Sequence, residues 1–210
     1  MKAEETESFL KTVSQSPSEE DLPLFPLELW LYPGITLPLQ IFEPRYLSMI
    51  SERLKLNAGF GIVPICEGHE VGESPRIHPG GVEVRVVDWY QQNNGLLGIK
   101  VCGERRFRVR STDVLGNNLL IGVVDYMPLE AEDPILDRHR GLLDLLAELK
   151  NHPHAQALEL PEPDSTQSLS YQLSQLLPFD ADKKMALLTA KHAEERLNLI
   201  AQEVFDLANA

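Results

Sequence analysis

Residues 82–110 decide the fold class, and they read VEVRVVDWYQQNNGLLGIKVCGERRFRVR. Apolar and charged side chains alternate from Val82 to Arg85, which is the period of a strand with one buried face. The turn-forming residues 93–95, Asn-Asn-Gly, tolerate the positive φ of a tight hairpin, and an apolar return strand follows them. The stretch from Val82 to Cys102 therefore predicts a β-hairpin.

Beyond Gly103, which we expect to separate two strands, the sequence predicts a strand with two unlike faces. Phe107 and Val109 share one face. The other face carries three arginines, Arg106, Arg108 and Arg110. Because Glu83 and Glu104 belong to the same predicted sheet, a salt-bridged strand face is the favoured interpretation.

Short strands are also predicted on both sides of the hairpin. Residues 22–42, LPLFPLELWLYPGITLPLQIF, are long enough to span a membrane as a helix. Four prolines and Glu28 interrupt them, so extended segments buried in a β core are favoured instead. Pro44 then suits the first position of a helix that should end near Asn57. Six or so strands with this one inserted helix predict a small, closed or nearly closed barrel.

From residue 129 onward the pattern changes to helices. Leucines at three-and-four spacing predict helices over residues 135–150, 165–177, 181–190 and 192–207. In the last of these, the side chains expected to point inward are Leu197, Ile200, Val204 and Phe205. The fold class is therefore α+β. The predicted parts are an acidic flexible tail at 1–21, a β-barrel domain at 22–128 and a helical bundle domain at 129–210.

The composition restricts the classes of function. The 210 residues include 19 Lys and Arg against 32 Asp and Glu, and this net charge of −13 opposes binding to nucleic acid or to a phosphate surface. Two cysteines and an amino-terminal segment without an apolar stretch favour a cytoplasmic protein over an exported one. No Gly-Lys pair occurs, so the phosphate-cradling loop of an ATPase is not expected.

Several stretches of the chain resemble, in the same order, the N-terminal substrate-recognition domain of the Lon proteases. They are LPLFPLELWLYPGITLPLQIFEPRY (22–46), FGIVPI (60–65), GIKVCGERRFRV (98–109), IGVVDYMPLE (121–130) and SLSYQLSQLLPFDADKKMALLTAKHAEERLNLI (168–200). The similarity is closest to stand-alone bacterial forms that consist of this domain alone. The resemblance implies a PUA-like β pseudo-barrel with one inserted helix, followed by a C-terminal helical bundle. It also implies a non-enzymatic role in holding polypeptides rather than cutting them.

Aromatic residues near the start of the barrel are candidates for a surface that binds unfolded or extended polypeptides. Most of them should be core, with one or two exposed. The candidate binding residues are Trp30, Tyr32, Phe42, Tyr46, Arg106 and Arg108. Apolar contacts and strand addition at an open barrel edge would tolerate many sequences, and a protease or chaperone would be the partner that uses the bound chain.

Two other functions stay open at this point. The arginines of the strand after Gly103 could instead bind RNA phosphates, and an undescribed hydrolase would need a nucleophile beside a histidine. A zinc site is not expected, because only half of the usual ligand spacing is present among Cys66, His69, His78 and Cys102. We therefore expect no cofactor and no metal.

Overall fold

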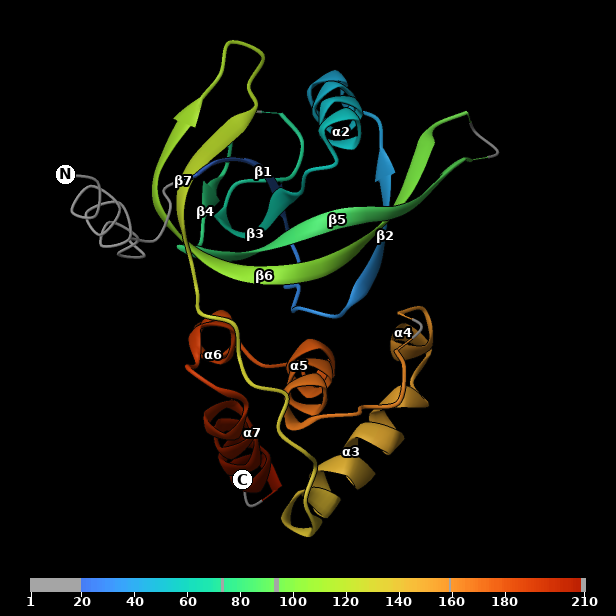
Figure 1. Ribbon diagram of the computed structural model, residues 1–210, viewed down its shortest axis with the longest axis vertical. Helices are drawn as coiled ribbons and strands as arrows, with labels where there is room; N and C mark the ends of the chain where they lie inside the picture. Colours follow the sequence, from blue (N-terminus) through green and yellow to red (C-terminus); the bar gives the residue numbers. More distant parts are fainter. Residues whose placement is uncertain (1–19, 73, 93–94, 159, 209–210) are drawn as a thin grey trace, which may run out of the picture.

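The computed structural model has a β-barrel above a group of helices (Figure 1). The structure describes residues 20–72, 74–92, 95–158 and 160–208. Residues 1–19 of the expected tail and the expected turn residues Asn93 and Asn94 lie outside these ranges. The strands are β1 (Glu20–Leu27), β2 (Thr36–Ile41), β3 (Phe60–Glu67), β4 (Arg76–Ile77), β5 (Gly80–Gln91), β6 (Leu97–Val114) and β7 (Leu120–Tyr126). The helices are α2 (Pro44–Leu56), the 3-10 turn η1 (Asp137–His139), α3 (Arg140–Lys150), α4 (Pro153–Gln156), α5 (Thr166–Leu176), α6 (Ala181–Thr189) and α7 (Ala193–Ala208).

The strands close into a ring, which confirms the predicted barrel. β1, β7, β6, β5 and β3 follow one another as hydrogen-bonded neighbours, and β3 returns to β1 in parallel, with Leu24 opposite Gly61. β2 lies off this path and pairs antiparallel with the first third of β6, where Ile41 is opposite Leu97. The predicted α+β fold is therefore confirmed, with the helices following the barrel in the chain.

β6 is one continuous strand where the sequence predicts two. Gly103 does not end it but marks a bulge, since the register with β5 shifts between Glu83 and Val84. A Cβ atom at Gly103 would lie 2.6 Å from the carbonyl oxygen of Tyr32, so only glycine lets that loop approach. The glycine therefore has a packing role inside the strand.

The helix α2 begins and ends as predicted. Pro44 lies in its first turn, and Asn57, with φ of 48°, ends it in the left-handed conformation. Its inner face buries Tyr46, Met49 and Ile50 in the apolar core of the barrel. The Tyr46 ring stacks on Phe25 of β1 with the ring centroids 4.0 Å apart. This packing fixes α2 against the barrel (Figure 1).

The bundle follows the predicted pattern in α5 and α6. Ser165 and Asp180 cap these helices, because each side chain accepts a hydrogen bond from a backbone N–H in the first turn. The predicted apolar stripe of α5 is confirmed, with Leu169 and Leu173 fully buried. Among the helices in the described ranges, none is both long and apolar enough to cross a membrane.

Three details of the bundle differ from the predictions. α3 begins at Arg140 rather than near residue 135, since the 3-10 turn η1 directly precedes it, and the Asp133 carbonyl upstream accepts a hydrogen bond from the Thr166 N–H of α5. The predicted loop after α3 contains the short helix α4. Phe205 was expected to point inward but is 65% exposed, since burial along α7 ends near Ile200.

The barrel and the helices share one apolar core. The rings of Tyr32, between β1 and β2, and Tyr171 of α5 lie with their centroids 6.3 Å apart, within a cluster that includes side chains from both parts. The Tyr32 hydroxyl also donates to the Lys184 carbonyl in α6 at 3.0 Å. The division into two domains at residue 128 stays a prediction.

Candidate functional site

The structure sorts the six candidate binding residues by exposure. Phe42 is 52% exposed, Arg108 is exposed and Trp30 is partly buried. The enclosed candidates are Tyr32, Tyr46 and Arg106. The barrel core and the bundle cover most of these three side chains, although Tyr46 still lines a groove at the surface. Trp30, Phe42 and Arg108 are the candidates with exposed surface, and the six-residue binding set stays a prediction.

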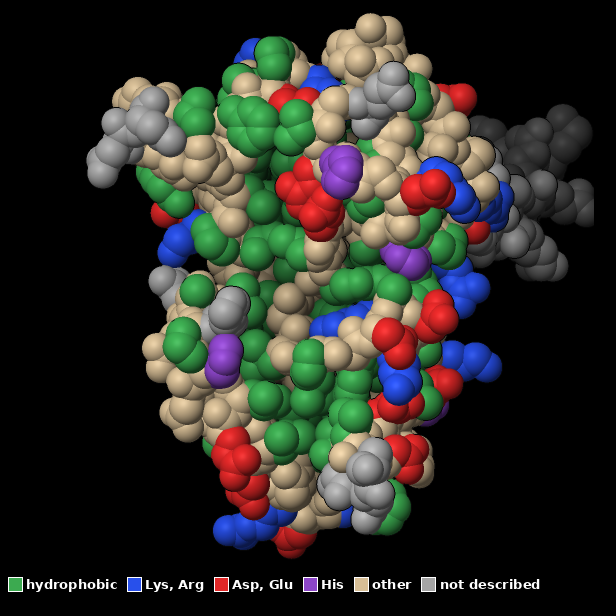
Figure 2. Space-filling view, turned by 180° about the vertical axis from the view of Figure 1, so that it is seen from behind, with side chains coloured by type: hydrophobic (Ala, Val, Ile, Leu, Met, Phe, Trp, Pro, Cys, Tyr) green, Lys and Arg blue, Asp and Glu red, His purple; other side chains and the backbone are tan. Residues whose placement is uncertain are grey.

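An apolar groove lies beside β2 and brings Phe42 and Tyr46 together. It has a volume of about 170 Å³, and its walls also include Leu29, Leu39 and Val71. We call it the barrel groove. From behind, hydrophobic side chains cover part of the barrel and continue downward to the bundle (Figure 2). Sequence reasoning missed Val71, which lies in a loop between strands and has no periodic neighbours that could mark it.

The strand β2 presents an open edge at this groove. In the described part of the chain β2 pairs only with β6. Just before β2, the Ile35 carbonyl accepts the Gly103 N–H at 3.0 Å, so residues 35, 37, 39 and 41 turn their backbone groups toward β6. The backbone groups of residues 36, 38 and 40 therefore point away from it. Pro38, which has no N–H to donate, suits this outward position.

Carboxylates surround the mouth of the barrel groove. Glu43 lies 2.9 Å from Arg45, which neutralises it. Glu70 accepts a hydrogen bond from the Glu28 N–H at 2.7 Å, and the Glu28 carboxylate contacts His69 at 3.3 Å. Acidic side chains with a neighbouring histidine are visible beside hydrophobic ones on the barrel (Figure 2). The groove thus combines apolar walls with an acidic rim.

The same carboxylates affect the tyrosine in the groove wall. Burial raises the pKa of Tyr46 to about 12. Arg45 acts in the opposite direction, while Glu43 and Glu70 raise this pKa further. Tyr46 therefore stays a neutral wall of the groove at any physiological pH.

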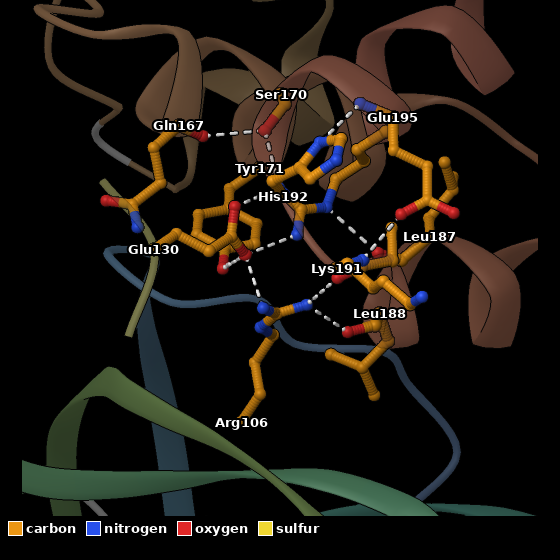
Figure 3. Close-up of polar contacts among 12 residues, drawn as sticks. Arg106, Glu130, Gln167, Ser170, Tyr171, Leu187, Leu188, Lys191, His192 and Glu195 are labelled. Atoms are coloured by element: carbon orange, nitrogen blue, oxygen red, sulfur yellow. Dashed lines mark hydrogen bonds and ion pairs between the residues drawn. The ribbon is translucent and has the colours of Figure 1, made fainter. Parts of the chain in front are cut away.

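Arg106 fastens the barrel to the bundle (Figure 3). From β6 it reaches Glu130, with 2.5 Å between Nη2 and Oε1, and Nη1 donates to the carbonyls of Leu188 and Ala190 at 2.7 and 2.6 Å. Burial lowers the pKa of its guanidinium. All these partners belong to the protein itself. Arg106 is therefore a buried residue whose charge is satisfied within the protein, and it links the barrel to the bundle.

A second arginine binds the same carboxylate from the opposite side. Arg196 of α7 donates to Glu130 at 2.6 Å, and its Nε donates to the Leu187 carbonyl at 2.9 Å. The Tyr171 hydroxyl also donates to Glu130 at 2.6 Å, and the Tyr171 ring lies 4.1 Å from the Arg196 guanidinium carbon. We call Arg106, Glu130 and Arg196 the charge triad.

The charge triad carries one excess positive charge in a buried place. The carbonyls of Leu187, Leu188 and Ala190, at the C-terminal end of α6, accept the arginine N–H groups. These are the carbonyls that a helix leaves without internal partners, and they form the negative end of its dipole. The helix end therefore offsets the excess charge. No periodicity in the sequence could indicate this arrangement.

Other arginines on these strands are ion-paired, but Glu83 and Glu104 pair with arginines outside the predicted face of Arg106, Arg108 and Arg110. The pairs are Arg105 with Glu83 at 3.1 Å, Arg85 with Glu104 at 2.8 Å, and Arg110 with Asp125. Within the cluster, Arg106 is buried in the charge triad, whereas Arg108 and Arg110 are exposed. Ion pairing offsets the charge of Arg85, Arg105 and Arg110, which weighs against a phosphate-binding surface on these strands.

Lys184 of α6 is buried beside Tyr32. Its ammonium donates to the carbonyls of Ser174 and Gln175 at the end of α5, at 2.5 and 3.2 Å. Burial lowers the pKa of Lys184 from 10.5 to about 8. In the described residues no carboxylate pairs with it, so neutralisation near pH 8 relieves a desolvation penalty rather than breaking an ion pair.

The stability of the protein should rise with pH because of Lys184. Between pH 8 and 10.5 the unfolded chain binds more protons at this site than the folded one, so the free energy of unfolding should increase by about 2 kcal/mol from pH 7 to 9.5. In Lys184→Met this increase should disappear. Urea unfolding at several pH values measures it. Lys183→Met, at an exposed neighbouring lysine, should keep the wild-type rise, and a flat wild-type profile would contradict the prediction.

The residues weighed as zinc ligands lie in unlike surroundings. Cys66 is exposed and Cys102 is partly buried in β6, and neither forms a disulfide. His69 contacts Glu28, while the His78 ring packs on Trp30 at 5.0 Å. Across the ranges that the structure describes, no three His, Cys, Asp or Glu side chains are grouped to hold a metal ion.

A second apolar groove lies between α3 and α7, and sequence reasoning missed it. Its volume is about 530 Å³, and its walls include Leu142 and Leu145 of α3 with Ala201, Val204 and Phe205 of α7. We call it the bundle groove. The signal was present in the sequence, because Val204 and Phe205 continue the apolar stripe of α7 beyond the part that is buried.

Comparisons with known proteins agree with this architecture. Residues 21–204 match the profile of the ATP-dependent protease La (LON) substrate-binding domain. A Lon N-terminal domain protein from Xanthomonas campestris is 30% identical in sequence, with a TM-score of 0.71 over 87% of this chain and 98% of that one. The N-terminal domain of the Mycobacterium avium complex Lon protease shares the fold, with 18% identity and a TM-score of 0.59 over 87% and 97% of the two chains.

Among curated proteins there is no match. The profile match nevertheless spans both the barrel and the bundle, including Phe42 and the charge triad. The chain belongs to the family of the Lon substrate-binding domain.

Proposed function

We propose that this chain is a non-catalytic module that holds extended polypeptide segments in the barrel groove. The observation that carries the proposal is the open edge of β2 beside the exposed side chain of Phe42. An added strand would gain main-chain hydrogen bonds from residues 36–40, and the groove would accept one of its apolar side chains. Main-chain bonding is independent of sequence, so many unfolded or extended chains would be clients.

The family and the chemistry of the chain support this function. The matched family is described by substrate binding. A module that holds chains without cutting them works with a protease or chaperone that receives them. Cys66 and Cys102 are unpaired thiols, which suits the reducing conditions of the cytoplasm. Arg108, exposed on β6, remains a candidate for additional contacts with a bound chain.

Truncation of Phe42 should weaken binding. The probe is a fluorescein-labelled ten-residue peptide with a central Phe flanked by Gln, and its anisotropy is titrated with the full chain. We expect Phe42→Ala to lower the affinity about tenfold, because removing a well-packed aromatic contact at an interface costs about 1–2 kcal/mol. The urea midpoint should change little, since Phe42 is half exposed.

Phe205→Ala is the matched control, because Phe205 is a comparably exposed phenylalanine in the bundle groove. It should leave the affinity unchanged. A loss with Phe205→Ala but not with Phe42→Ala would move the site to the bundle groove and contradict the proposal. Two further probes test strand addition: one carries N-methyl groups at the odd-numbered backbone positions of the peptide, and the other at the even-numbered positions. One of these two peptides should no longer bind, because its methyl groups would replace the N–H groups that bond to β2. Equal binding of both peptides would exclude strand addition.

A further inference from the structure

Glu28 and Glu70, two carboxylates at the barrel groove, differ from Glu43 in their ion pairing. In the described part of the chain, neither Glu28 nor Glu70 forms an ion pair with Lys or Arg, whereas Glu43 is paired with Arg45. The Glu28 side chain is 57% exposed, and it contacts the ring of His69, which is itself exposed. The rim therefore keeps a negative charge that is available to a ligand.

These carboxylates lie where the neighbours of a bound apolar side chain would pass. Glu70 lines the same groove as Phe42, and the Glu28 N–H bonded to its Oε1 at 2.7 Å holds the two residues together. In an extended chain, residues on either side of a seated side chain project away from the groove floor toward the rim. A flanking charge would then lie close to Glu28 and Glu70.

From this arrangement we propose that the barrel groove selects extended segments in which an apolar residue is flanked by lysine or arginine. The occupant is thus a polypeptide segment with alternating apolar and basic character, recognised by charge complementarity with Glu28 and Glu70. This inference rests on the proposed function, because it specifies the client that the same groove would hold. Acidic segments are repelled, which also keeps the protein's own acidic surfaces, part of its net charge of −13, from occupying the groove.

The test compares three peptides that differ only in the residues flanking the central Phe: Lys, Gln or Glu. Anisotropy titrations with the full chain at low salt should rank them Lys, Gln, Glu, with about a tenfold span in affinity between the first and last. The span should shrink as salt is added, because exposed charges are screened. It should fall to less than about twofold in the double variant Glu28→Gln with Glu70→Gln.

Glu52→Gln is the matched control, because Glu52 is an exposed carboxylate on α2 that does not line the groove. It changes the net charge by the same amount as one rim substitution and should keep the tenfold span. If Glu52→Gln reduced the difference in affinity between the Lys and Glu peptides as much as Glu70→Gln does, the effect would be one of net charge, and the inference would be overturned. Equal binding of all three peptides would also overturn it while leaving the proposed function intact. Failure of all three to bind would remove the proposed function itself.

Should Glu70→Gln alter folding, the exposed Glu28→Gln variant tests the same point alone. Its urea midpoint should match that of the wild type, because the Glu28 side chain is 57% exposed and contacts the exposed His69. If the ratio of affinities for the Lys and Glu peptides falls by half or more in this variant, the inference is supported. An unchanged ratio contradicts it.

Discussion

Glu130→Gln should lower the free energy of unfolding by about 3–5 kcal/mol. The substitution removes the negative charge between two buried arginines, Arg106 and Arg196, while keeping the size of the side chain. Breaking a buried ion pair from one side leaves an uncompensated charge, which costs far more than the pair contributes when complete. The two guanidinium groups would then lie close together without a carboxylate between them, opposed by neutral acceptors such as the carbonyls at the end of α6 and the Ser170 hydroxyl.

Urea unfolding followed by circular dichroism measures this effect. Glu132→Gln is the control, because Glu132 is an exposed carboxylate on the same connector, and its replacement should change the stability by less than about 0.5 kcal/mol. If Glu130→Gln were as mild as Glu132→Gln, the charge triad would not be what joins the barrel to the bundle. Because Glu130 does not line the barrel groove, folded Glu130→Gln protein should bind peptide normally.

Phe107→Ala should be the second large effect, with a loss of about 3–5 kcal/mol. The ring is fully buried in a small cluster on β6 that is separate from the main core. Its removal takes away apolar burial and leaves a cavity between strands that cannot easily collapse. The ring packs directly over the backbone at two glycines, since Cβ atoms at Gly61 and Gly81 would each lie 2.7 Å from its Cζ atom. Chemical denaturation of Phe107→Ala measures the loss.

The two glycines provide a test of this geometry. Gly61→Ala should lower the free energy of unfolding by about 1–3 kcal/mol in the wild-type protein, and by much less in the Phe107→Ala variant. The reason is that the atoms nearest the new methyl group are side-chain ends of Leu24 and Phe107. Gly81→Ala should stay damaging in both backgrounds, since its Cβ would also meet the backbone carbonyl of Ile62. Equal rescue of both glycines would contradict the packing described for Phe107.

The barrel strands and the bundle helices were predictable because their signals are local. Alternation between Val82 and Arg85, the proline at position 44 and the caps Ser165 and Asp180 each act over a few residues. Gly103 was misjudged because a glycine in a strand reads as a break. Only the approach of the Tyr32 carbonyl, from more than seventy residues away, shows why the strand continues through it.

The candidate site was only partly predictable. Phe42 and Trp30 were singled out by type, but an aromatic residue in a strand-rich segment has the same pattern whether it is buried or exposed. The burial of Tyr46 depends on where α2 packs, and the burial of Tyr32 depends on where α5 and α6 meet the barrel. No sequence pattern pointed to Val71, Glu28 or Glu70. These residues lie in loops, and only the folded chain brings them to the groove.

The sequence by itself determined the α+β class, the order of barrel and helices, and the acidic character of the chain, because periodicity, turn chemistry and charge are properties of neighbouring residues. Only the tertiary structure decided that Arg106 and Arg196, ninety residues apart, bind one carboxylate, and that β2 keeps an open edge beside Phe42. Burial and strand pairing depend on which distant segments of the chain contact one another. One local sequence pattern is compatible with several different sets of such contacts.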